Sequence, residues 1–298
     1  MNLFDPRVLT RLKNLSLRAR SVVDGVMVGI HPSRAKGFSS EFEGHREYSP
    51  GDEVQHMDWK AFGKFDRYFI KEYQETTHLR AYIVLDRSGS MGYASDGYSK
   101  FDYGATLAAS LSYLLLKQQD AVGLILFSRR IERMIPPKAF PGHFWAILKA
   151  LEGQKPGGET SGGDVLQELA GSLKRRGLII LISDLLDDPQ KVLRGLKQMR
   201  SRGSDVLVFH LLDRDELEFP FDQPAIFKDL EEDLRLPADP QVIRSAYLNT
   251  LRSLLQSYEK TCASYQIDYQ LFPTSAGLDK ALTKYLTWRK NFKPRSAG

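Results

Sequence analysis

The fold is decided by an apolar run that ends in a polar turn, Ala81-Tyr82-Ile83-Val84-Leu85-Asp86-Arg87-Ser88-Gly89-Ser90-Met91. Its first five residues have the composition of a strand that is buried on both faces, which is typical of a parallel sheet. The strand ends at an aspartate, and two serines follow in alternate positions. Ligands of open parallel sheets bind beyond the carboxyl ends of the strands. We therefore expect Asp86 at the functional edge of an α/β sheet.

Short apolar runs alternate with longer amphipathic segments from Arg80 onward, which favours a mostly parallel sheet with helices on both faces. The remaining predicted strands span residues 121–128, 177–184, 205–213 and 266–272, and residues 130–135 are expected to pair antiparallel beside the first of these. The predicted helices span residues 103–118, 142–151, 164–175, 189–202, 240–264 and 278–290. An acidic stretch over 213–239 interrupts this alternation, and we expect it to contain a hairpin through 225–230 and 234–236.

The first 78 residues have a different pattern from the rest of the chain. One amphipathic helix is expected near residues 6–23, and a region rich in Gly, Pro and aromatic residues follows and ends in a strand over 68–75. The sequence thus predicts two parts. Residues 1–78 form an ordered extension packed on the core, and residues 79–298 form the sheet domain with its C-terminal helices.

Composition excludes several classes of protein. The net charge of +5 comes from 42 basic and 37 acidic residues that are interspersed, which does not indicate nucleic-acid binding. The only cysteine, Cys262, excludes an internal disulfide and a multi-cysteine metal site. Basic residues throughout 1–20 leave no apolar stretch for a signal peptide or a membrane span. We expect a cytoplasmic protein without a membrane span.

The polar turn after the first strand has the chemistry of a hard-cation site. Asp86, Ser88 and Ser90 can turn their oxygens toward one point, and Mg²⁺ prefers oxygen ligands in near-octahedral geometry. Two further segments, residues 157–162 and 181–184, would reach the same edge and supply a third hydroxyl and a second carboxylate. Hydroxyls and waters as direct ligands would leave the cation strongly electrophilic, so that it favours an acidic side chain from a partner.

We expect these groups to be surface ligands that the fold does not need. The alternative for any one of the three segments is that its Asp and Ser residues only form a turn that caps a helix. The occurrence of all three segments at strand ends favours the metal site.

The same residues resemble the metal-ion-dependent adhesion site of von Willebrand factor A domains, in which an Asp-x-Ser-x-Ser run is followed by a Thr and, after a further strand, by an Asp. The resemblance implies a site for Mg²⁺ or Mn²⁺ made of Asp86, Ser88, Ser90, Thr160 and Asp184. The usual pattern places Thr directly after the glycines, whereas Glu159 intervenes here. The third hydroxyl is therefore that of Thr160 or Ser161.

A second stretch, Glu41-Phe42-Glu43-Gly44-His45-Arg46-Glu47-Tyr48-Ser49-Pro50-Gly51-Asp52-Glu53 followed by Met57-Asp58-Trp59-Lys60, closely resembles the signature of the bacterial family called domain of unknown function 58. The resemblance extends over nearly the whole chain. It implies a von Willebrand factor A-like fold, no enzymatic activity and a MoxR-type AAA+ ATPase as partner. The implied role is chaperone-like maturation or assembly of an unidentified client protein.

Two enzymatic alternatives are open to test. Ser90, Asp184 and His210 occur in the chain order of an α/β-hydrolase triad, although a nucleophile elbow would need Gly in place of Ser88. Metal-dependent phosphoester hydrolysis usually requires more direct carboxylate or histidine ligands than this site offers. The glycines of 157–163 lack the Gly-Lys-Ser/Thr that holds phosphates, so we do not expect ATP hydrolysis by this chain.

Overall fold

The structure is a computed structural model that describes residues 4–9, 12, 14–30, 42–47, 68–73, 79–158, 161–173, 176–231 and 234–291. Its compact units are Met1–Ile30 with Leu79–Lys293, and His31–His78 with Pro294–Gly298. In the second unit, β1 (Phe42–Glu47) pairs antiparallel with β2 (Phe69–Tyr73). The division between the units therefore falls inside the predicted extension 1–78. Packing of its later part on the core stays a prediction.

The larger unit is built on a six-stranded sheet with the order β10-β7-β6-β3-β4-β5. These strands are β3 (Arg80–Asp86), β4 (Ala121–Phe127), β5 (Ile131–Lys138), β6 (Leu178–Ser183), β7 (Asp205–Leu212) and β10 (Asp268–Pro273). All neighbouring strands are parallel except β5, which runs antiparallel to β4. The predicted α/β class with a mostly parallel sheet is confirmed.

The order of the strands fixes where a ligand site can form. The chain passes from β3 to β4 on one side and later returns to β6 on the other side of β3. The switch in direction therefore lies between β3 and β6, and the crevice of a doubly wound sheet opens at the carboxyl ends of two such strands. Asp86 is the last residue of β3, and Ser183 is the last residue of β6.

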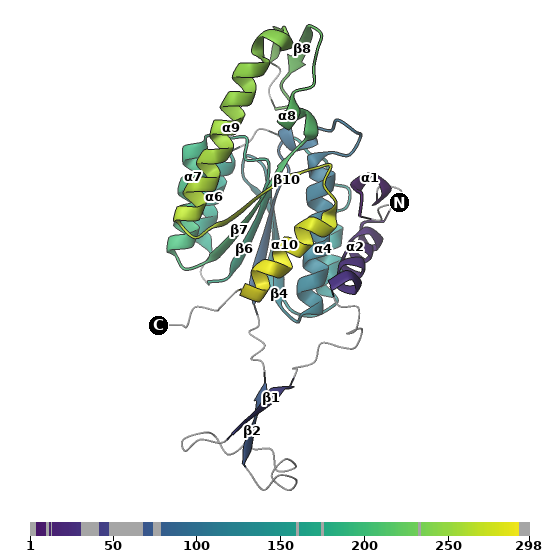
Figure 1. The fold of residues 1–298 in the computed structure, drawn as a ribbon, viewed down its shortest axis with the longest axis vertical. Helices are drawn as coiled ribbons and strands as arrows, with labels where there is room; N and C mark the ends of the chain where they lie inside the picture. The colour runs from purple at the N-terminus through teal and green to yellow at the C-terminus, as the bar shows by residue number, and fades with distance from the viewer. Residues whose placement is uncertain are drawn as a thin grey trace. The chain divides into compact units, whose positions relative to one another are not determined.

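Helices cover both faces of the sheet (Figure 1). One face carries α2 (Leu15–Ile30), α4 (Lys100–Lys117), α5 (His143–Leu151) and α10 (Leu278–Asn291). The other face carries α6 (Gly162–Ser172), α7 (Pro189–Ser201) and α9 (Pro240–Ser264). Ile83 and Leu85 pack toward the first group, whereas Val84 packs toward the second, as the alternation of side chains along a strand requires. None of the described helices has the length and apolar character needed to cross a membrane.

Capping side chains explain two differences from the predicted helices. The expected helix 6–23 is divided into α1 (Pro6–Leu9) and α2, because the side chain of Asn14 accepts a hydrogen bond from the Ser16 N–H at 2.8 Å and caps a new start. Helix α4 begins at Lys100, three residues before the predicted start. Ser99 and Asp102 form a capping box there.

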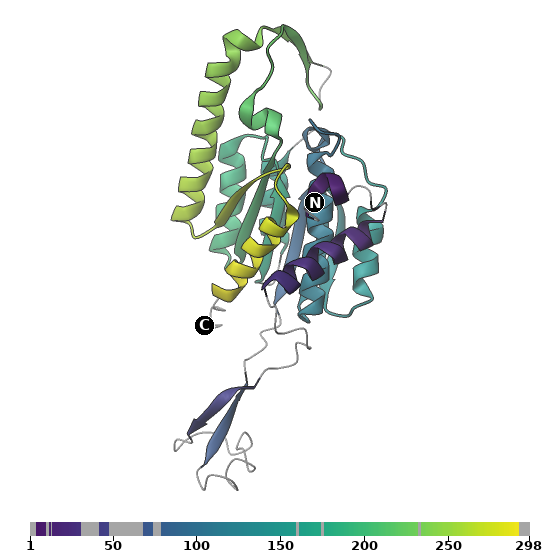
Figure 2. The ribbon, with the colours of Figure 1, turned by 45° about the vertical axis from the view of Figure 1, so that its right-hand side comes forward.

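The segment between β7 and α9 contains the predicted hairpin. It begins with α8 (Arg214–Glu218), and β8 (Ala225–Lys228) then pairs antiparallel with β9 (Arg235–Ala238). Figure 2 shows that the hairpin lies beyond the carboxyl ends of the strands and reaches toward the loop after β3. The ring of Phe227 in β8 stacks on Phe219 with centroids 5.8 Å apart, and this contact holds the hairpin to the segment after α8.

Candidate metal site

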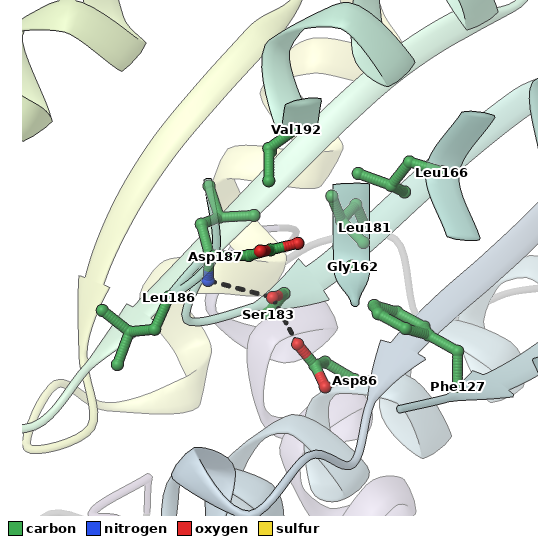
Figure 3. Close-up of a pocket in the computed structure, with 10 residues that line it drawn as sticks. Asp86, Phe127, Gly162, Leu166, Leu181, Ser183, Leu186, Asp187 and Val192 are labelled. Atoms are coloured by element: carbon green, nitrogen blue, oxygen red, sulfur yellow. Dashed lines mark hydrogen bonds between the residues drawn. The ribbon is translucent and has the colours of Figure 1, made fainter. Parts of the chain in front are cut away.

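Asp86 is buried at the switch point, with only 1% of its surface exposed. One carboxylate oxygen accepts the Ser88 N–H at 2.9 Å. The other accepts the hydroxyl of Ser183 at 2.7 Å (Figure 3). Burial and the charge of Asp184 raise the pKa of Asp86 to about 7, although these hydrogen bonds oppose the rise. A carboxyl group with this pKa lies in a place that disfavours its negative charge.

The prediction that the site groups are exposed surface ligands is wrong for three of them. Asp86, Ser88 and Asp184 are each at most 1% exposed. The reason is their position at the carboxyl ends of the two central strands, where the loop before α6 and the connection between β8 and β9 lie against the turn after β3. Substitutions here therefore affect packing and hydrogen bonding as well as any ligand.

The turn after β3 brings two hydroxyls together. The hydroxyl oxygens of Ser88 and Ser90 are 3.1 Å apart. The Gly89 N–H donates to the Gly158 carbonyl at 2.9 Å, and the Gly157 N–H donates to the Arg87 carbonyl at 2.9 Å. The loop before α6 therefore lies against the turn after β3, where the sequence placed it.

Two residues are candidates for the third hydroxyl of the site. Thr160 lies outside the described residues. Ser161 is half-buried directly before α6, and its side chain makes no capping hydrogen bond to that helix. Thr160 and Ser161 therefore both remain candidates for the third hydroxyl.

Asp184 follows β6 directly and is fully buried in an ion pair that the sequence did not reveal. The ammonium of Lys100 lies 2.8 Å from its carboxylate and also pairs with Glu216. Burial acts to lower the pKa of Lys100, but the charges of Asp184 and Glu216 and their hydrogen bonds outweigh burial and raise it. One internal cation thus offsets part of the negative charge at the end of β6.

The hydrolase triad is not assembled. His210 is buried in β7, and its two ring nitrogens lie 2.6 Å from the Tyr269 hydroxyl and 2.7 Å from the backbone carbonyl of Asp184. Burial lowers the pKa of His210 to about 4, so that the ring is neutral near pH 7. The Ser90 hydroxyl pairs with Ser88, and the Asp184 carboxylate pairs with Lys100. Neither group engages the imidazole as a triad requires.

A small cavity of about 10 Å³ lies beside Asp86 and Ser183 (Figure 3). Apart from these two residues and Asp187, its walls are glycine and apolar side chains, among them Phe127, Leu166 and Leu181. A cavity of this size accommodates about one water molecule.

The connection between β8 and β9 lies against the turn after β3. The Ser90 N–H donates to the carboxylate of Glu231 at 3.2 Å. A side chain at Gly89 would collide with this segment, since its Cβ would lie 2.4 Å from the carbonyl oxygen of Leu230. The turn after β3 is therefore in contact with β6, with the loop before α6 and with the hairpin.

Sequence reasoning missed four residues of this site. Ser183 lies within the predicted strand end 181–184, directly before the predicted ligand Asp184. This position could have indicated a role for its hydroxyl. Lys100 could have been placed in a helix by the capping pattern of Ser99 and Asp102. Glu216 and Glu231 carry no local signal, because their partners are far away in the sequence. Glu216 lies 116 residues after Lys100, and Glu231 lies 141 residues after Ser90.

The donor groups at this edge suit a hard divalent cation. Within the described residues, no group of three or more His, Cys, Asp or Glu side chains could hold a metal, so any site here depends on hydroxyls. Ser88 and Ser90 offer hydroxyl oxygens, and the carboxyl group of Asp86 accepts the Ser88 N–H. Asp184 is close enough to Asp86 for its charge to act on that group. Oxygen donors of this kind are those of Mg²⁺ and Mn²⁺.

Comparison with known proteins gives matches across most of the chain. The family model described as protein of unknown function DUF58 matches residues 44–254. An uncharacterised protein of Mycobacterium tuberculosis is 26% identical over 232 residues, which cover 76% of this chain and 72% of the relative. The conserved hypothetical protein BatB from Bacteroides thetaiotaomicron is 16% identical, with a TM-score of 0.49 over 72% of this chain and 100% of that chain. The von Willebrand factor A domain of SpRpn10 is 15% identical, with a TM-score of 0.43 over 70% and 95% of the two chains.

Proposed function

Because the chain belongs to the DUF58 family of proteins of unknown function, we propose a function from the site itself: this is a non-enzymatic module that binds a protein partner through Mg²⁺ or Mn²⁺. The residues that would hold the ion are Asp86, Ser88, Ser90, Asp184 and either Thr160 or Ser161.

One observation carries this proposal. Two serine hydroxyls, 3.1 Å apart, meet at the switch point of the sheet next to the buried carboxyl group of Asp86, which accepts the Ser88 N–H at 2.9 Å. When bound there, a divalent cation supplies a positive charge with a coordination position that an incoming carboxylate can take. The chain contributes neutral hydroxyls as ligands, and it holds Asp86 in place through Ser183 and the Ser88 N–H. We therefore propose an acidic side chain as the group by which the partner is recognised.

The identity of the partner is a proposal that rests on the family resemblance. We propose a MoxR-type AAA+ ATPase, with which this chain would act in chaperone-like maturation or assembly of a client protein. The chain would then bind the partner, and the partner would hydrolyse ATP.

Binding of a co-encoded AAA+ ATPase is expected to require the metal. Removal of Mg²⁺ with EDTA should weaken the complex by about 2–5 kcal/mol, because a buried charged contact loses its counterpart. Calorimetry in Mg²⁺, in EDTA and after re-addition of excess Mg²⁺ measures this, and re-addition should restore the affinity. Equal affinity in all three conditions would show that the partner binds elsewhere, for example at residues 41–60.

The purified protein is expected to show no turnover of ATP, p-nitrophenyl acetate or p-nitrophenyl phosphate. His210 is engaged by Tyr269 and by a backbone carbonyl, and the Ser90 hydroxyl pairs with that of Ser88, so no base is positioned to activate Ser90. Ser90→Ala is the control, since it removes the only serine of the sequence-predicted triad. Hydrolysis by the wild type that disappears in Ser90→Ala and is insensitive to EDTA would contradict the proposal in favour of a serine hydrolase.

A further inference from the structure

The connection between β8 and β9 brings a carboxylate of this chain to the candidate metal site. Glu231 accepts a hydrogen bond from the Ser90 N–H at 3.2 Å. The Ser90 hydroxyl lies 3.1 Å from that of Ser88, and the Ser88 N–H donates to Asp86 at 2.9 Å. Two carboxylates from distant segments thus contact the same turn, Asp86 at the Ser88 N–H and Glu231 at the Ser90 N–H.

The approach of this connection is too close for an incidental surface contact. A Cβ on Gly89 would lie 2.4 Å from the Leu230 carbonyl oxygen and 2.9 Å from the Cγ of Glu231. Only glycine fits at position 89 while the connection stays in place. In addition, the Asp229 side chain accepts the Glu231 N–H at 2.6 Å, which orders the backbone next to this carboxylate.

We infer that Glu231 is an internal carboxylate ligand of the metal site and that it takes the position at which a partner's acidic side chain would bind. This inference rests on the proposed metal-dependent function. The chemistry is the same in both cases, because a cation held by neutral hydroxyls attracts any carboxylate that can reach it. Glu231 has the advantage of belonging to the same chain, and its high effective concentration keeps the position filled until a partner displaces it.

The hairpin is built so that Glu231 can leave. The side chains of Ile226, Leu234 and Leu236 are 59–68% exposed, and elements with few buried apolar groups open at low free-energy cost. Phe227 remains available as an anchor, since its ring packs on both Phe219 and Phe221. A partner could therefore move the connection away from Ser90 while β8 stays attached at its aromatic end.

The test uses the full chain, Mn²⁺ and acetate as the carboxylate probe. In Glu231→Gln, Mn²⁺ should bind about tenfold more weakly, because a charged ligand is lost. Each bound Mn²⁺ should relax water protons more strongly, because water fills the vacated position. Acetate should bind to the Mn²⁺ complex about tenfold more tightly than in the wild type. Electron paramagnetic resonance of free Mn²⁺ and water-proton relaxation during acetate titration measure these three changes.

The changes have opposite directions, which separates the inference from simple damage to the site. Damage would weaken both Mn²⁺ and acetate binding, and this result would overturn the inference. Glu218→Gln, which removes the same charge from an exposed residue of α8, should leave all three values unchanged. If Glu231→Gln behaves like Glu218→Gln while Asp86→Asn still weakens Mn²⁺ binding about 100-fold, Glu231 is no ligand and the proposed function stands. If Asp86→Asn also binds Mn²⁺ normally, the proposed function fails with it.

Discussion

Asp86→Asn is expected to reduce Mn²⁺ affinity by about 100-fold. This is the upper end of the range for the loss of a group that supports a metal site. Asparagine has the shape of aspartate, so its carbonyl oxygen can still accept the Ser88 N–H, and the Ser183 hydroxyl can turn to accept from the amide. The charge alone is removed. Electron paramagnetic resonance of free Mn²⁺ measures the affinity. Mn²⁺ should also raise the melting temperature of the wild type but not that of the variant, because only a bound ion stabilises the folded state.

Asp120→Asn is the matched control for this experiment. Asp120 is also 1% exposed, but it accepts the Leu79 N–H at 2.7 Å at the opposite edge of the sheet. Its substitution should lower stability and leave Mn²⁺ affinity unchanged. Asp86→Ala is a less clean variant, because the Ser88 N–H and the Ser183 hydroxyl would both lose their acceptor at about 1–3 kcal/mol for each buried group. Equal Mn²⁺ affinity in wild type and Asp86→Asn would reject the metal site.

The sheet and the edge that carries the site were predictable because both follow from local patterns. Each strand of a buried parallel sheet is a short apolar run, and the residue after the run marks the carboxyl end. Asp86 and Asp184 could therefore be assigned to one edge before their strands were known to be next to each other. The hairpin was predictable for the same reason, since two short apolar segments flank the acidic residues of its connection.

Burial and long-range pairing could not be predicted in this way. Lys100 was omitted from the predicted helix 103–118, and a lysine near a helix start usually lies in solvent. Its burial depends on two carboxylates, Asp184 and Glu216, that are 84 and 116 residues away in the sequence. Glu231 belongs to an acidic run that resembles any solvated loop. Only the folded chain shows that its carboxylate reaches Ser90.

Lys100→Met is expected to lower the free energy of unfolding by about 3–5 kcal/mol, as removal of one partner from a buried ion pair does. Methionine fills a similar volume, so the loss comes from charge rather than from a cavity. Asp184 would remain fully buried without its ammonium partner, and Glu216 would lose the same partner. Urea denaturation followed by circular dichroism measures the change.

Lys117→Met is the matched control on the same helix. Lys117 pairs with Asp24 at 3.1 Å, but both side chains are more than 40% exposed, so the loss should stay below about 1 kcal/mol. A loss in Lys100→Met no larger than this would show that the buried pair does not stabilise the fold.

Mn²⁺ links this result to the metal site, because a cation beside Asp86 and Asp184 supplies the positive charge that the variant lacks. Saturating Mn²⁺ should therefore raise the melting temperature of Lys100→Met by more than that of the wild type, and it should have no such additional effect on Lys117→Met.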